Sequence, residues 1–248
     1  MKKVLLVFFS ITTMSYFSFS QEKTPEIVEN NSYTDLGADI LSSYIWRGLK
    51  IDAAPNIQGW GEFGIAGFNF GVWASTNFTG SFAETDIYAG YSIGNLNTTV
   101  TNYFTGNSSF FSFNKAEIQH VGELTMEYTL SKKFPLKITA GTLFYGDDYK
   151  IDSYDINGDP VFNETRNYST YFEFMYPFTH AETEIAVVLG GVAHESAFYE
   201  SDGAAIINIG AKVSKELKVT DYFKLPVSFG VTVNPATESI YSIFNISL

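Results

Sequence analysis

The chain has 248 residues, a formal net charge of −12 at pH 7 and no cysteine, which excludes disulfides, thiolate metal sites and a lipidated N-terminal cysteine. Hydrophobic residues make up 45% and aromatic residues 17%, but mean hydropathy is only +0.01 and no second long apolar run follows the N-terminus. This pattern disfavours a helical membrane protein, and the negative charge disfavours nucleic-acid partners.

Residues 1–20 have the features of a secretory signal peptide. Two lysines precede an apolar stretch over residues 4–19, and Ser18–Ser20 supplies small residues at the cleavage positions. An uncleaved membrane anchor is the alternative, but the Ser and Thr residues within the run favour cleavage. Residues 21–32 are polar and lack periodicity, so we expect them to form a flexible periplasmic N-terminal segment.

Residues 36–48, with the sequence LGADILSSYIWRG, alternate between apolar and mixed positions. Because successive side chains of a strand point to opposite sides, this stretch predicts a strand with two different faces. The apolar face ends in Tyr44 and Trp46, which we expect at an outer lipid interface. The opposite face carries Asp39 and Arg47, which we expect to point inward.

The same alternation continues to the end of the chain, without a convincing helical period. Most of the predicted strands run about ten residues, the length that a tilted strand needs to cross a bilayer core. In chain order the predicted strands cover residues 36–48, 57–65, 68–74, 87–93, 96–104, 124–130, 136–144, 168–176, 185–189, 205–213, 225–233 and 240–248.

The predicted connections alternate in length. Links after even-numbered strands are mostly tight, such as Gly94-Asn95, whereas links after odd-numbered strands include residues 106–116 and 146–166. Short turns at one rim and long loops at the other are typical of outer-membrane barrels, and an even strand number places both termini on the periplasmic side. Residues 215–224 are long for a periplasmic turn, so we expect the flanking strands to extend there.

A soluble β-sandwich is the alternative fold, because alternation alone does not show whether the apolar face meets a core or lipid. The signal peptide, regular strand length, loop asymmetry and aromatic strand ends together favour lipid. The sequence therefore predicts an all-β protein: a single transmembrane antiparallel up-and-down β-barrel of about 12 strands over residues 33–248. We expect it in the outer membrane of a Gram-negative bacterium.

Acidic side chains dominate the face opposite the predicted lipid face. Ionised groups stay charged only where water or partners solvate them, so this face indicates a hydrated channel or a dense polar network. The candidate pore-lining residues are Arg47, Glu62, Asp86, Glu123, Glu127, Lys137, Glu173, Glu184 and Lys212. The alternative is a barrel filled by its own side chains, including Trp60, Trp73, Tyr88, Tyr103, Tyr145 and Tyr171.

Three segments carry a family resemblance: Ser42–Leu49 (SSYIWRGL), Pro55–Gly59 (PNIQG) and Glu84–Tyr91 (ETDIYAGY). They resemble the TorF-type porin family, which shows an aromatic-Arg-Gly segment ending its first strand and a Gln-Gly soon after. The family's fourth strand carries an acid-x-Asp-x-Tyr-x-Gly-Tyr segment. The resemblance covers residues 36–93 and implies an outer-membrane barrel with channel activity, but no particular substrate.

Two hypotheses for Arg47 remain open at this point. An ion pair with Asp86 on the fourth strand would narrow and polarise the channel entrance. Alternatively, Arg47 pins the first loop through a neighbouring carboxylate such as Glu62.

Two other chemistries are weaker candidates. An outer-membrane hydrolase would use His194 as its base, but its neighbours Glu195 and Ser196 are adjacent in the chain and rarely converge as a triad requires. The acidic residues of loop 147–159 suit calcium by ligand type, although their glycine spacing favours a solvated loop.

The sequence thus predicts a porin-like channel for passive diffusion of small polar solutes, cationic or neutral, and no enzyme. The alternative is a non-conducting barrel with a structural or adhesive role through its extracellular loops. The expected partners are outer-membrane lipid, small polar solutes and the barrel-assembly machinery during biogenesis. We expect no cofactor, no metal and no nucleic-acid partner.

Overall fold

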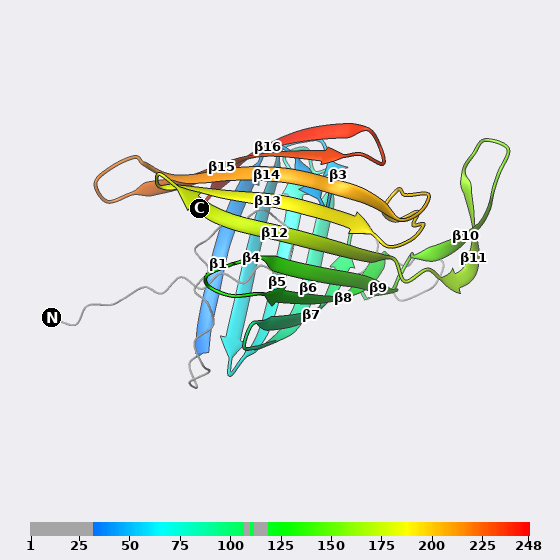
Figure 1. The fold of residues 1–248 in the computed structure, drawn as a ribbon, viewed down its shortest axis with the longest axis horizontal. Helices are drawn as coiled ribbons and strands as arrows, with labels where there is room; N and C mark the ends of the chain where they lie inside the picture. Colours follow the sequence, from blue (N-terminus) through cyan, green and yellow to red (C-terminus); the bar gives the residue numbers. More distant parts are fainter. Residues whose placement is uncertain (1–31, 107–109, 112–118) are drawn as a thin grey trace.

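The computed structural model describes residues 32–106, 110–111 and 119–248. Within these ranges, twelve antiparallel strands close into one barrel, which confirms the predicted fold class (Figure 1). No helix in the described ranges is long and apolar enough to cross a membrane. The predicted signal peptide and nearly all of the N-terminal segment lie outside the described residues.

Each barrel strand corresponds to one of the twelve predicted strands. They are β1 (Ser32–Leu41), β4 (Asn56–Ile65), β5 (Phe68–Asn77), β6 (Ala83–Ile93), β7 (Leu96–Phe104), β8 (His120–Thr129), β9 (Lys137–Tyr145), β12 (Thr170–His180), β13 (Thr183–Val192), β14 (Ala205–Lys218), β15 (Lys224–Asn234) and β16 (Ser239–Ser247). Consecutive barrel strands pair with each other, and β1 closes the barrel by pairing with β16.

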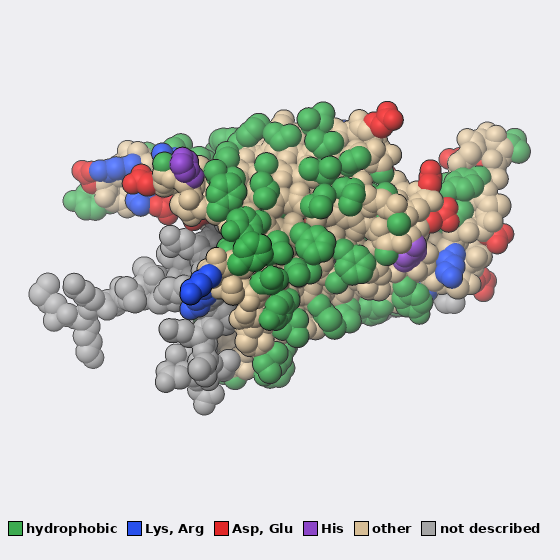
Figure 2. All heavy atoms as spheres, in the orientation of Figure 1, with side chains coloured by type: hydrophobic (Ala, Val, Ile, Leu, Met, Phe, Trp, Pro, Cys, Tyr) green, Lys and Arg blue, Asp and Glu red, His purple; other side chains and the backbone are tan. Residues whose placement is uncertain are grey.

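Side chains alternate between the two faces of the wall, as the period-two pattern predicts. On β5, Phe70 and Val72 point outward and are 52% and 45% exposed, whereas Trp73 points inward and is 5% exposed. Figure 2 shows apolar side chains covering the middle of the barrel, while charged side chains gather towards its two ends. Exposed apolar side chains on the other strands, such as Val100, Phe172 and Phe229, continue this surface as a broad apolar belt.

The two ends of the barrel differ. At the turn end, tight hairpins form at Ala66-Gly67 and Ala181-Glu182, where both residues have positive φ, as in the type I′ turns that suit strand twist. At the same end, β14 and β15 stay paired out to Lys218 and Lys224, so the expected strand extension is confirmed (Figure 1). At the loop end, the hairpin of β10 (Tyr149–Tyr154) and β11 (Pro160–Arg166) projects from the wall.

The predicted first strand, residues 36–48, is wrong beyond Leu41. The backbone bends at Ser42-Ser43, where the Ser42 hydroxyl accepts a hydrogen bond from the Phe244 amide (2.9 Å). The chain then forms a separate hairpin of β2 (Tyr44–Trp46) and β3 (Leu49–Asp52).

The side chains of β2 are buried inside the barrel. Tyr44 is 2% and Trp46 5% exposed, so these rings do not form the outer interface that the sequence pattern predicts. The expectation fails because the apolar alternation of β1 continues in phase across the bend, although the chain direction changes there.

Candidate functional site

The β2–β3 hairpin enters the lumen from the loop end, and its turn, Arg47-Gly48, contacts the wall at β14 and β15. Both turn residues have positive φ (48° and 82°), which a glycine adopts readily. The Gly48 carbonyl accepts a hydrogen bond from Asn234 Nδ2 at 3.1 Å. A side chain at Gly48 would overlap the backbone carbonyl of Ile207, so both the turn and the close approach require glycine.

Substituting Gly48 with alanine is expected to lower the free energy of unfolding by about 2–3 kcal/mol, because a strained backbone conformation adds to a clash with β14. The matched control is Gly94→Ala, which has a similar positive φ (57°) but open space around the new methyl group. We expect that control to lose about 1 kcal/mol in urea unfolding. Equal losses for the two variants would mean that the hairpin turn does not press on the wall.

Arg47 forms a buried ion pair with Glu123 of β8. Its Nη1 donates to Glu123 Oε1 and its Nη2 donates to Oε2 at 3.0 Å, so the guanidinium binds the carboxylate through two parallel hydrogen bonds. Nη1 also donates to the hydroxyl of Tyr199 at 2.7 Å. The two charged side chains are 1% and 0% exposed.

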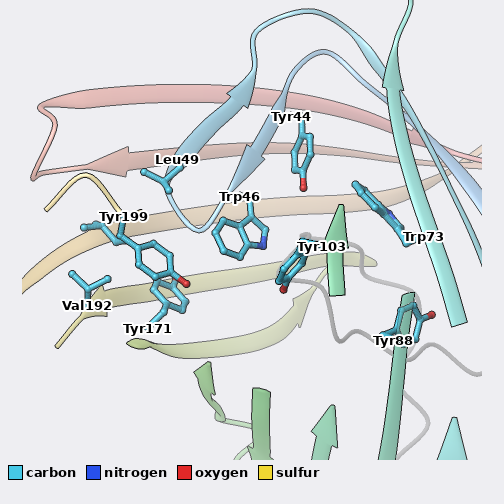
Figure 3. Packing of buried hydrophobic residues seen from close by; sticks show 10 residues of the cluster. Tyr44, Trp46, Leu49, Trp73, Tyr88, Tyr103, Tyr171, Val192 and Tyr199 are labelled. Atoms are coloured by element: carbon cyan, nitrogen blue, oxygen red, sulfur yellow. The ribbon is translucent and has the colours of Figure 1, made fainter. Parts of the chain in front are cut away.

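Aromatic rings enclose the same guanidinium. Its central carbon lies 4.5 Å from the ring centroid of Trp46 and 4.7 Å from that of Tyr171, distances at which a cation is attracted to a ring face. Tyr199 stacks on both rings, with centroids at 5.7 and 5.8 Å. Figure 3 shows Trp46 between Tyr103 on one side and Tyr199 and Tyr171 on the other.

Neighbouring wall residues hold the Glu123 carboxylate in a fixed orientation. Its Oε2 accepts hydrogen bonds from the hydroxyls of Tyr103 (2.7 Å) and Thr125 (3.0 Å), both carried by β7 and β8. The carboxylate therefore remains fixed in orientation even apart from Arg47. We call the assembly of Trp46, Arg47, Tyr103, Glu123, Tyr171 and Tyr199 the Arg47 cluster.

The loop between β13 and β14 supplies Tyr199, which the sequence analysis missed. A polar network anchors this loop: the Ser169 hydroxyl contacts Ser196 Oγ (2.6 Å) and donates to Asp148 Oδ1 (2.6 Å). Tyr199 is fully buried, and burial raises the pKa of its phenol, which keeps it a hydroxyl that Arg47 can approach. Its partners lie far away in the sequence, so no local pattern points to it.

The predicted site residues on strands all lie on the inward face. Glu62, Asp86, Glu123, Lys137, Glu173 and Lys212 are buried, whereas Glu127 and Glu184 are partly exposed near the turn end. Several of them engage neighbours along the wall instead of a central aqueous space. Lys137 pairs with Glu127 at 3.2 Å, and the Tyr171 hydroxyl donates to Glu173 at 2.7 Å.

Neither expected partner of Arg47 is the one observed. Glu62 instead accepts hydrogen bonds from Tyr33 (2.6 Å) and Asn69 (3.2 Å), near the turn end of the barrel. Asp86 sits between Trp73 and Tyr103 on the adjacent strands and is 0% exposed. In the described part of the chain, no side chain donates a hydrogen bond to either carboxylate oxygen of Asp86.

Replacing Asp86 with asparagine is expected to raise the free energy of unfolding by about 1–2 kcal/mol, because a fully buried carboxylate without a side-chain donor is more costly than a neutral amide. Asp35→Asn is the control, since the Asp35 carboxylate accepts a hydrogen bond from Trp60 Nε1 at 2.9 Å. That variant should lose stability in the same urea titration. A loss for Asp86→Asn as well would show that Asp86 has a stabilising partner in the native barrel.

The residues of the hydrolase and calcium hypotheses make other contacts. His194 Nε2 faces the backbone carbonyl of Asn167 at 3.2 Å, while Ser196 belongs to the anchoring network of the β13–β14 loop. Asp155 caps its own turn by accepting from the amides of Asn157 (2.8 Å) and Asp159 (2.9 Å), and these bonds lower its pKa. Over the described ranges, no three His, Cys, Asp or Glu side chains group as metal ligands.

The Arg47 cluster thus joins the inserted hairpin to β7, β8 and β12 of the wall and to the loop between β13 and β14. No protein-family model matches the chain, and no curated protein matches it either.

Proposed function

We propose that the protein is a porin-like channel of the outer membrane for small polar solutes, narrowed at its loop end by the β2–β3 hairpin. The observation that carries the proposal is an apolar outer belt around an interior of polar and charged side chains. A closed barrel with this distribution satisfies its backbone hydrogen bonds while meeting lipid outside. The predicted signal peptide and the TorF-type resemblance support the same proposal.

Cations and neutral solutes are the proposed cargo, because acidic side chains outnumber basic ones along the inward face. Glu184 is only partly buried near the turn end, where its carboxylate can attract cations from the periplasm. Outer-membrane lipid and the barrel-assembly machinery are the proposed partners during and after insertion.

A second candidate function is a non-conducting barrel that acts through its loops. The buried Arg47 cluster favours this reading, because its side chains fill the lumen where the hairpin crosses it. The β10–β11 hairpin, which projects from the loop end, would then present a binding surface.

Single-channel recording in planar bilayers distinguishes the two functions. We expect small, cation-preferring conductance steps from the native protein and several-fold larger steps from Arg47→Ala, since that variant releases the hairpin from Glu123. Lys50→Ala is the control: it removes the same charge from an exposed position on the same hairpin and should conduct like the native protein. Absence of steps from both the native protein and Arg47→Ala would contradict the channel and support the non-conducting barrel.

A further inference from the structure

The wall residues of the Arg47 cluster form a binding site, and the guanidinium group of Arg47 on the hairpin occupies it. Glu123, Tyr103 and Thr125 sit on β7 and β8, and Tyr171 sits on β12, so these side chains stay in place when the hairpin leaves. We propose that this wall site binds guanidinium groups of external ligands, and that guanidinium compounds are the solute class that acts on the channel. The statement about solutes rests on the proposed channel function, whereas the binding site itself does not.

The geometry selects a guanidinium over an ammonium ion. Two nitrogens of Arg47 meet the two oxygens of Glu123, a match that a planar fork makes and a point charge does not. The ring face of Tyr171, 4.7 Å from the guanidinium carbon, suits a flat cation. The hydroxyls of Tyr103 and Thr125 hold the carboxylate in the orientation that this pairing needs.

Burial makes an empty site unfavourable. Glu123 is 0% exposed with the hairpin docked, so removal of the Arg47 side chain leaves this carboxylate without its counter-charge. A guanidinium ion from solution restores both the charge and the paired hydrogen bonds. The same ion does not help where the carboxylate is absent.

In the native protein, Arg47 is favoured over free ligands because the hairpin that carries it is part of the same chain. A group held on a short hairpin has an effective concentration near its site in the millimolar range or above, so free ligands compete only during the fraction of time that the hairpin is undocked. Ligand binding and hairpin release are therefore linked. A solute that occupies the wall site keeps the hairpin out of it.

Chemical rescue of Arg47→Ala tests the site directly. Thermal unfolding of that variant in lipid vesicles is followed while guanidinium chloride is added at millimolar concentrations, with sodium chloride and methylammonium chloride as controls. At ten times its dissociation constant, guanidinium should raise Tm by about 3–6 °C, whereas the two control salts should not. The double variant Arg47→Ala, Glu123→Gln should not respond to guanidinium, and the native protein should respond much less than Arg47→Ala, because its own Arg47 competes for the wall site.

An equal response to all three salts, or a response that survives Glu123→Gln, would overturn the proposal. If Arg47→Ala folds only in the presence of guanidinium, the refolding yield replaces Tm with the same expected dependence on Glu123. A refolding yield that does not depend on guanidinium, from a variant that shows no Tm response, would also overturn it.

Bilayer recording separates this inference from the channel function. Guanidinium should reduce the current through Arg47→Ala, and the reduction should be lost when Glu123→Gln is added. If Arg47→Ala conducts but guanidinium does not reduce its current, guanidinium compounds are rejected as the ligand class, and the channel function is still supported. Thermal rescue without any conductance would support the wall site and reject the channel.

Discussion

Replacing Arg47 with alanine is expected to lower the free energy of unfolding by about 3–5 kcal/mol, because the substitution leaves a buried carboxylate without its counter-charge. It also removes the cation from between the rings of Trp46 and Tyr171. Urea titration in lipid vesicles, followed by tryptophan fluorescence, measures the loss. Urea is the appropriate denaturant here, since guanidinium would itself bind the wall site that we propose.

The exposed ion pair between Lys224 and Glu216 provides the control. Its nitrogen and oxygen are 2.6 Å apart, but the two side chains are 63% and 59% exposed, so Lys224→Ala should destabilise the barrel far less than Arg47→Ala. Replacing both partners of the buried pair, with Arg47→Met and Glu123→Leu, should cost less than Arg47→Ala alone. Similar losses from Arg47→Ala and Lys224→Ala would contradict a buried, desolvated pair.

Placing an arginine at Val72 is expected to lower the free energy of unfolding in a bilayer by about 2–4 kcal/mol. Val72 lies midway along β5 and points outward with 45% of its surface exposed, where the proposed environment is hydrocarbon. The guanidinium would have to leave water to occupy this position. Reversible unfolding from lipid vesicles measures the change.

Val219→Arg is the matched control for this prediction. Val219 is 57% exposed in the turn between β14 and β15, beyond the apolar belt, so the same substitution should change stability by no more than about 0.5 kcal/mol. Nearly equal, small effects at Val72 and Val219 would mean that both positions face water. The apolar belt would then need another explanation than lipid.

The wall of the barrel was predictable from sequence because its two faces meet different surroundings. Along β5, the outward side chains from Phe68 to Ala74 are all apolar and alternate with inward ones, and this period can be recognised in the sequence. The β2–β3 hairpin was not predictable in the same way. Tyr44 and Trp46 continue the phase of β1, and only the weak signal of Ser42-Ser43 marks the change of direction.

The candidate site was predictable only in part. The inward placement of Glu123 and Glu173 follows from strand parity, which is a local property of the chain. Pairing across the lumen is not local: Arg47 and Glu123 are 76 residues apart, and Tyr199 comes from an irregular loop. The sequence pattern therefore placed Asp86 and Glu62 on the inward face correctly, but it could not show which inward carboxylate lies next to Arg47.

The position of the hairpin also has a consequence for the order of folding. It lies between the first two wall strands in the chain, but Arg47 bonds to Tyr199 across 152 residues, and Asn234 bonds to Gly48 across 186. Contacts this distant form late, since they require the closure of very long loops. Because the bond from Asn234 to Gly48 requires β15 to be part of the wall, we expect the hairpin to dock late in folding.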